Sequence, residues 1–318
     1  MSQRTSVLSI LLAFTAVYLV WGSTYLAIAI SIESMPPFLM LAVRYVVAGG
    51  LILAWSVWRG HERATLRQVF YAMVVGIATL SVGTGTVAWA EKEITSGVAA
   101  LLVTTVPLWM VFLDWRWFGG RRPRPQVMLG LALGLAGVAI LAAPDLDGGM
   151  RGWAMLAVVV GSAFWSVGSM HSKRMDLPRS LARSSAWQML GGGAGMLAAG
   201  LVAGEYSGLD RHAITMPSVA ALLYLILFGS VVAFSAYIWL LAHVPAQQIA
   251  SYAFVNPVVA VVLGWLLAGE ELNVQIGVAM AVLVTSVALI VHYGRSPRTP
   301  AAMAVESTPM PAAAIASR

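Results

Sequence analysis

The chain has 318 residues, a net charge of +6 and a mean hydropathy of +0.83, with 59% hydrophobic and 10% charged residues. Soluble domains carry about 25% charged residues, so most of the surface of this chain must face lipid. Cysteine is absent, which excludes disulfides, thiolate nucleophiles and cysteine-ligated metals.

Hydropathy divides the chain into ten runs that are long enough to cross a bilayer, which takes roughly 20 mostly apolar residues. Most boundaries between the runs carry proline, glycine or charge. The predicted spans are 7–30, 36–58, 67–89, 94–114, 126–143, 151–171, 183–204, 216–241, 246–268 and 273–293.

The two ends of the chain differ from each other. The first run is too long for the core of a signal peptide, so we keep it as a membrane helix. Residues 295–318 are rich in proline and alanine and lack periodic apolar residues. We therefore predict a disordered cytoplasmic tail there.

Lysine and arginine fix the predicted orientation. With the N-terminus in the cytoplasm, fifteen of the nineteen basic residues fall in cytoplasmic segments, three fall outside, and Arg44 lies inside the second span. Cytoplasmic loops carry an excess of such residues, so both termini are predicted to be cytoplasmic. Because this distribution accounts for the pI of about 9.9, we do not expect nucleic-acid binding.

The two halves of the chain resemble each other. Residues 89–119 and 239–269 align without gaps with seven identical pairs in 31 positions, including two tryptophan pairs and the pair Pro107/Pro257. We interpret this as a duplication, with residues 1–145 as the first repeat (helices 1–5) and residues 146–294 as the second (helices 6–10). Five is odd, so the second repeat enters the membrane in the opposite sense. Inverted repeats bind substrate near the midplane, between the halves.

Polar atoms interrupt the first span at its centre, in the stretch "VWGSTY". Trp21 lies at about the same depth from one face as Trp165 lies from the other. The hydroxyls of Ser23 and Thr24 either return to the backbone of the preceding turn or face a wet cavity. Gly22 either allows close helix packing or belongs to that cavity.

Arg44 lies well inside the second predicted span, about 12 Å below the outer edge, whereas the other arginines and lysines lie at span ends or between spans. A cation at this depth normally faces the bundle interior or a cavity. Two interpretations are open. The side chain caps carbonyls or reaches outward toward Glu33 or Glu91, or it contacts the carboxylate of a substrate.

Prolines interrupt the fourth and ninth spans. Pro107 and Pro257 are predicted to break their helices and to free the carbonyls of Val103 and Ala253. Such carbonyls need a hydroxyl, water or ligand as partner in a bilayer. The breaks are either plain kinks or a gate.

Other polar and aromatic residues complete the set of candidates. Most of the 12 tryptophans are expected in the interfacial belt or the core. Glycines in 130–137 and 191–195 are predicted packing faces, not phosphate loops. The candidate substrate-binding residues are Trp21, Ser23, Thr24, Arg44, Trp89, Trp165, Tyr237, Tyr252 and Asn256, with Pro107 and Pro257 as gating positions.

Five stretches together resemble one family. They are "VWGSTY", "RYVVAG", "SGVAALLVTTVP", "YAFVNPVVAVVLG" and the following "GEEL", and they are similar to an EamA-domain exporter of the drug/metabolite transporter superfamily. The likeness covers residues 7–293. It implies an all-α membrane fold of ten helices in two inverted repeats, a central cavity and alternating access. This chain departs from the pattern after the fourth helix, where "GGRRPRP" lacks an acidic residue that the second repeat keeps as Glu270.

We therefore expect a secondary transporter that exports small metabolites or amino acids across the bacterial inner membrane. It needs no cofactor or metal and is not expected to be an enzyme. The alternatives are an integral-membrane enzyme and a channel-like facilitator without coupling. Coupling to protons is left open, with Glu91 or Glu93 at the outer end of the third helix as candidates. The substrate, the direction of transport and the oligomeric state are open, a monomer being one option.

Overall fold

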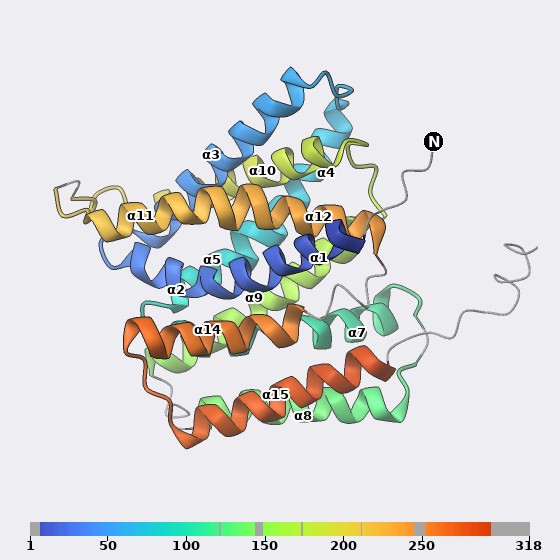
Figure 1. The fold of residues 1–318 in the computed structure, drawn as a ribbon, viewed down its shortest axis with the longest axis vertical. Helices are drawn as coiled ribbons and strands as arrows, with labels where there is room; N and C mark the ends of the chain where they lie inside the picture. The colour runs from blue at the N-terminus through green and yellow to red at the C-terminus, as the bar shows by residue number, and fades with distance from the viewer. Residues whose placement is uncertain are drawn as a thin grey trace, which may run out of the picture.

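The structure, a computed structural model, describes residues 7–120, 122–143, 149–172, 174–210, 212–244 and 252–293, and in this part of the chain it consists of helices and loops. The helices run along one common direction, so the loops gather at two ends (Figure 1). We call the end that carries residues 59–65 and 174–180 the basic end. The end that carries residues 33–36, 91–95 and 269–273 is called the opposite end.

In the first half, some helices are single and others are joined end to end into longer helical segments. In the described residues, three short segments, η1 and η2 here and η4 in the second half, are π-helical and continue directly into α-helices. The elements are α1 (Val7–Thr15), η1 (Ala16–Val20), α2 (Trp21–Ile32), α3 (Pro37–Trp58), α4 (Leu66–Gly76), η2 (Ile77–Thr84), α5 (Gly85–Ala90), α6 (Ser96–Val103), α7 (Val106–Trp117) and α8 (Pro125–Ala142).

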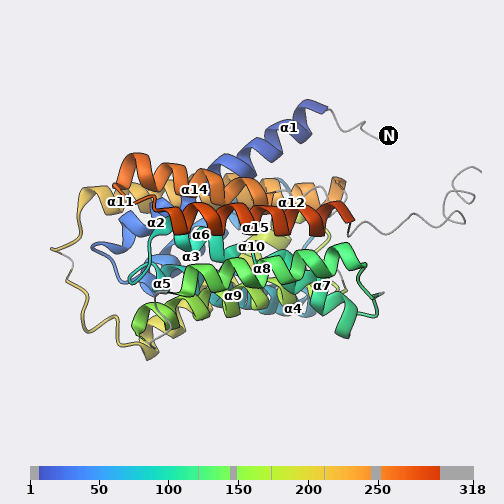
Figure 2. The same ribbon diagram turned by 90° about the horizontal axis from the view of Figure 1, so that it is seen from below.

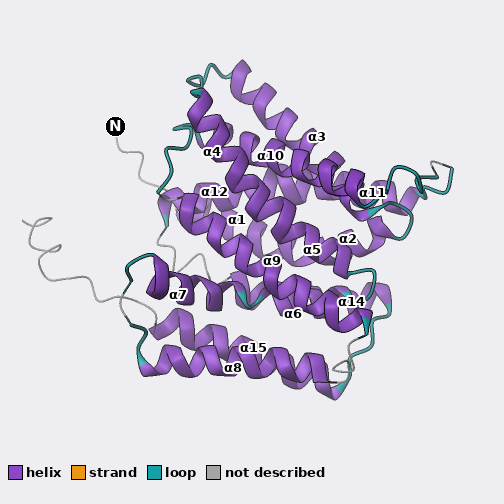
Figure 3. Ribbon diagram, turned by 180° about the vertical axis from the view of Figure 1, so that it is seen from behind, coloured by secondary structure: helices purple, strands orange, loops and turns teal. Residues whose placement is uncertain are grey.

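The second half repeats this arrangement, and the π-helical segment η4 again joins two α-helices, α11 and α12, end to end. The elements are α9 (Met150–Ser172), α10 (Leu181–Val202), α11 (Met216–Tyr224), η4 (Leu225–Val232), α12 (Ala233–His243), α14 (Tyr252–Ala268) and α15 (Val274–Tyr293). Figure 3 shows the described chain as helices joined by loops, the one between α10 and α11 being long.

Eight helical stretches of the described chain are long and apolar enough to cross a membrane. The other two predicted spans coincide with α10, which is less apolar because it carries Arg183 and Gln188, and with α14, described only from Tyr252 onward. The count of ten spans and the inverted orientation therefore stay predictions. The tail 295–318, the repeat boundary at 145/146 and four basic residues used for topology (Arg4, Arg121, Lys173 and Arg211) lie outside the described residues.

Two helix pairs flank the bundle. α3 packs along α10 on one side and α8 packs along α15 on the other, as Figure 1 shows. Between them, α2 packs against α14 and α11, while α9 packs against α7, η2 and α5. α1 projects from the bundle in Figure 2 and buries none of its residues.

Glycines set the closeness of these contacts. A Cβ on Gly191 or Gly192 would lie within 3 Å of Met73 or Leu80, and one on Gly76 would collide with the backbone of Gln188. Glycines of α8 face α15 in the same way, with Leu283 against Gly137. Small residues let helices in lipid gain van der Waals contact where no hydrophobic driving force exists. The predicted packing faces are confirmed.

Candidate functional site

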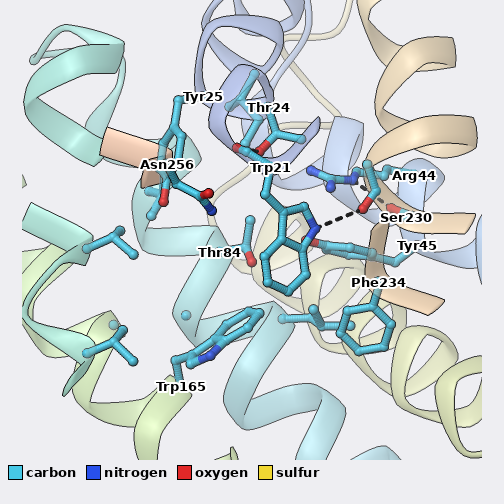
Figure 4. A pocket seen from close by; sticks show the side chains of 18 of the residues that line it. Trp21, Thr24, Tyr25, Arg44, Tyr45, Thr84, Trp165, Ser230, Phe234 and Asn256 are labelled. Carbon is cyan, nitrogen blue, oxygen red and sulfur yellow. Dashed lines mark hydrogen bonds between the residues drawn. The ribbon is translucent and has the colours of Figure 1, made fainter. Parts of the chain in front are cut away.

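Two cavities lie inside the bundle. The central cavity, of about 100 Å³, is bordered by polar and aromatic side chains from both halves (Figure 4). The second cavity, of about 290 Å³, extends toward the basic end, where Pro178 and Leu181 line it. Val106, Trp165, Phe234 and Tyr252 border both cavities, so these four residues form a shared wall.

Arg44 contributes the positive charge of the central cavity. Its side chain is 4% exposed, its Nε donates to Ser230 Oγ at 2.9 Å, and its guanidinium lies 5.0 Å from the centre of the Tyr45 ring. Its Nη1 has no hydrogen-bond acceptor in the described chain. The Arg44 side chain does not reach outward to Glu33 or Glu91, because it donates a hydrogen bond to Ser230 instead. A guanidinium with a free donor in a cavity can bind a carboxylate or another anion.

Four aromatic residues predicted as candidates lie together. The Trp21 ring is 4.9 Å from Tyr237, 5.6 Å from Tyr252 and 6.1 Å from Trp165, measured between ring centres. Edge-on contacts at such distances favour aromatic pairs beyond the area that they bury. Trp21 also donates from Nε1 to the carbonyl of Gly229, at 3.2 Å. Figure 4 shows Trp21 in the middle of the site, with Arg44 and Ser230 on one side and Tyr25 and Asn256 on the other.

The hydroxyls of the first span return to their own helix. Ser23 donates to the carbonyl of Val20 at 2.8 Å, and Thr24 to that of Trp21 at 2.6 Å. Ser23 also lies 2.6 Å from the hydroxyl of Tyr224. Thr24 borders the central cavity, whereas Ser23 borders neither cavity. Gly22 serves packing, because a Cβ there would lie 2.6 Å from Val259 on α14.

Asn256 joins the two halves at the cavity. With its amide nitrogen turned to the carbonyls of Tyr252 and Tyr18, it donates to both at 3.2 Å. Tyr18 lies in η1, where π-helical geometry alters the regular pattern of backbone hydrogen bonds. Asn256 therefore satisfies carbonyl groups that lipid could not.

The two prolines do different things. α6 ends at Val103 and α7 begins at Val106, so the first-half helix is interrupted just before Pro107. Ser166 donates to the carbonyl of Val106 at 3.1 Å. Pro257 lies inside the continuous helix α14, so the prediction that it breaks its helix is wrong. The neighbouring Asn256 donates to the carbonyl of Tyr252, one residue before the carbonyl of Ala253 that Pro257 leaves without its regular donor.

Trp89 lies away from both cavities. It is partly buried and packs against an apolar cluster that includes Val87, Val98 and Leu101. The structure also adds cavity residues that the sequence analysis did not single out, namely Tyr25, Tyr45, Thr84, Ser230 and Phe234. Thr84 and Ser230 lie in the π-helical segments η2 and η4, and such segments are frequent at functional sites. The signal in the sequence was small and polar residues within apolar spans.

Comparison with known proteins finds a family, two relatives and a solved structure. The sequence profile of the EamA-like transporter family matches residues 7–143 and 152–292. The chain is 39% identical over 284 residues to the uncharacterized inner membrane transporter YedA of Escherichia coli (strain K12), covering 87% of this chain and 89% of that one. It is 22% identical over 282 residues to the uncharacterized transporter YvbV of Bacillus subtilis (strain 168), covering 89% and 90%. A solved crystal structure shares the fold with a TM-score of 0.64 at 23% identity, covering 90% of this chain and 99% of that one.

Proposed function

We propose, because the chain belongs to the EamA-like transporter family, that it is a secondary transporter of the inner membrane that exports small carboxylate-bearing metabolites or amino acids by alternating access. The observation that carries this proposal is Arg44, which borders the central cavity and whose buried Nη1 has no hydrogen-bond acceptor in the described chain. Arginine does not lose its proton in proteins, so this donor needs a hydrogen-bond acceptor, which a substrate carboxylate can supply.

The surroundings of Arg44 favour an amphipathic substrate. Trp21, Trp165 and Tyr252 border the same cavity and offer apolar ring surface to a side chain. Ser230 orients the guanidinium from the far side. A carboxylate bound to Nη1 would leave the rest of the substrate against the aromatic rings, which fits a small amino acid or related metabolite.

The wall between the two cavities supports alternating access. Trp165 and Tyr252 stand between a cavity at the centre and a larger one toward the basic end. A channel needs an open path, whereas a carrier needs a barrier that moves. If the basic end is cytoplasmic, as the arginine distribution predicts, this conformation faces the cytoplasm and loads substrate for export.

The experiment is a panel of radiolabelled amino acids and carboxylates, exchanged across proteoliposomes that contain the purified protein. Arg44→Ala should lower exchange of carboxylate-bearing compounds about 10- to 100-fold, because hydrogen bonds to charged groups contribute about 1.5–3 kcal/mol. Arg44→Lys should restore only part of it, since an ammonium lacks the planar fork of donors.

Arg183→Ala is the matched control. Arg183 is also buried, at 8% exposed, but it donates to the carbonyl of His61 at 2.8 Å and borders neither cavity. Its loss should lower stability without changing which compounds are exchanged. Equal effects of Arg44→Ala on carboxylates and on their amide analogues would contradict the proposal.

A further inference from the structure

A second buried charged group lies at the opposite end of the bundle. Glu91, directly after α5, is 9% exposed, and neither of its carboxyl oxygens has a hydrogen-bond partner in the described chain. Its neighbour Glu93, two residues later, is exposed. An ionised carboxylate without donors is among the most costly groups to bury, and it normally becomes neutral by taking up a proton.

Glu270 increases the free-energy cost of an ionised carboxylate at Glu91. Glu270 follows α14 and accepts hydrogen bonds from the backbone nitrogens of Ser96 (2.8 Å) and Gly97 (3.0 Å) and from the Ser96 hydroxyl. These three donors lie at the start of α6 and all serve Glu270, so none of them reaches the oxygens of Glu91. Burial, and then the charge of Glu270, raise the pKa of the Glu91 carboxyl well above its usual range.

The other charged and titratable groups around Glu91 do not offset this arrangement. Tyr25 of α2 lies within range of its charge and is itself partly buried. α3 contributes Arg44 and Tyr45, which lie at the central cavity, and α9 contributes Arg151, which is exposed. Lys92 and Glu93 on the same segment are exposed and of opposite charge.

Glu91 is also joined to the central cavity. Its backbone nitrogen donates to the carbonyl of Val87 at 2.9 Å, and both Val87 and Tyr25 border that cavity. A movement that opens the opposite end to water would therefore reach Glu91 and the cavity together.

We propose that Glu91 is a proton-binding site that is filled while the opposite end is closed and emptied when that end opens. On opening, the carboxyl O–H gives its proton to water and leaves a hydrated carboxylate; on closing, it takes one proton back. This inference rests on the proposed alternating access. The proton site links closure of the opposite end to the pH of the solution on that side. Protons bind the closed conformation better and therefore shift the population toward it.

The first test uses N,N′-dicyclohexylcarbodiimide, a lipid-soluble reagent that modifies protonated carboxyls. Purified protein should gain one adduct, mapped to Glu91 by mass spectrometry. Its rate should fall about tenfold per pH unit above the pKa of Glu91, because only the protonated form reacts. Glu91→Gln should abolish the adduct and Glu93→Gln should leave it unchanged. An adduct on other carboxyls only, or an adduct that persists unchanged in Glu91→Gln, would overturn the proposal.

The second test separates this inference from the proposed function. Thr24→Cys places a single thiol at the central cavity of a chain that has no other cysteine. An impermeant maleimide added from the opposite end should label it faster as the pH on that side rises, and Glu91→Gln should remove this dependence while Glu93→Gln keeps it. A labelling rate that does not depend on pH would overturn the role of Glu91. No labelling from that side under any condition contradicts alternating access instead, while the carbodiimide result still decides whether Glu91 holds a proton.

Discussion

The central cavity and the carboxyl pair of Glu91 and Glu270 each contain a buried charged group with too few partners in the described chain. Arg44 keeps Nη1 without an acceptor, and Glu91 keeps both oxygens without a donor. The two groups can resolve this shortage in different ways. A guanidinium cannot become neutral, so it needs an anion or water, whereas a carboxyl becomes neutral by binding one proton.

This difference underlies the two proposals, substrate recognition at Arg44 and proton binding at Glu91. At the central cavity, aromatic rings of Trp21 and Trp165 leave room beside Arg44 for a small molecule. At the opposite end, Glu270 already has three donors from Ser96 and Gly97, so its neighbour Glu91 remains without any. Substrate recognition and proton binding can therefore be disrupted independently.

Reversing the charge at the central cavity should have the largest effect. Arg44→Glu is expected to lower exchange of carboxylate substrates at least ~100-fold, because it removes a charge-assisted hydrogen bond and adds repulsion. Exchange in proteoliposomes measures this, with elution from a sizing column as the control for folding. Carbodiimide labelling of Glu91 should persist. Loss of both properties in a folded variant would show that the two levels are one site.

Removing the ring at the middle of the aromatic cluster should mainly lower stability. Trp21→Ala is expected to lower the free energy of unfolding by about 3 kcal/mol, the lower part of the range for buried tryptophan, because Trp21 is only partly buried. Thermal melting in detergent checks this. The exposed Trp58 gives the matched control, since Trp58→Ala should leave the melting temperature unchanged. A melting temperature unaffected by Trp21→Ala would mean that the ring contacts add nothing to the closed bundle.

The carboxyl pair should make stability depend on pH. The pKa of Glu91 is raised in the folded protein, so the folded state binds the proton more tightly than the unfolded one. Stability is then full below the unfolded pKa and falls as pH rises toward the folded pKa, by up to about 1.4 kcal/mol per pH unit. Melting temperatures from pH 5 to 8 should fall in the wild type and fall less in Glu91→Gln. A melting temperature that falls more steeply with pH in Glu91→Gln than in the wild type would contradict the raised pKa of Glu91.

The smallest effect is expected at the hydroxyl of Thr24. Because this group bonds the carbonyl of Trp21 within its own helix, Thr24→Val should change exchange by less than about twofold, as a hydroxyl returned to the preceding turn contributes little. The initial rate for carboxylate substrates measures this beside Arg44→Ala. A loss as large as that of Arg44→Ala would make Thr24 a substrate ligand and extend the recognition site along the first span.

Much of the fold could be predicted from the sequence because lipid imposes simple rules. Apolar length locates the membrane helices, and glycine runs such as 191–195 mark close helix contacts, since neither depends on which helices become neighbours. The match of depth between Trp21 and Trp165 led to the expectation that both rings flank one cavity, and both border the central cavity.

The partners of individual polar atoms could not be predicted in this way. Thr24 and Ser23 had two possible partners each, and only the packed bundle shows that their hydroxyls return to the helix. Pro257 was expected to break its helix, but α14 continues through it while Asn256 donates to a carbonyl beside it. Such outcomes depend on side chains that neighbouring helices bring within a few ångströms.

The sequence by itself determined that this chain is a helical membrane protein and that Arg44 lies within an apolar span. Only the tertiary structure decided that Arg44 bonds Ser230 and keeps a donor free, and that Glu91 is buried beside Glu270. The physical reason is how far along the chain the residues that determine each property lie from one another. Hydropathy follows from the solvent along each segment, whereas the charge state of a buried group follows from donors and acceptors that arrive from distant segments of the chain.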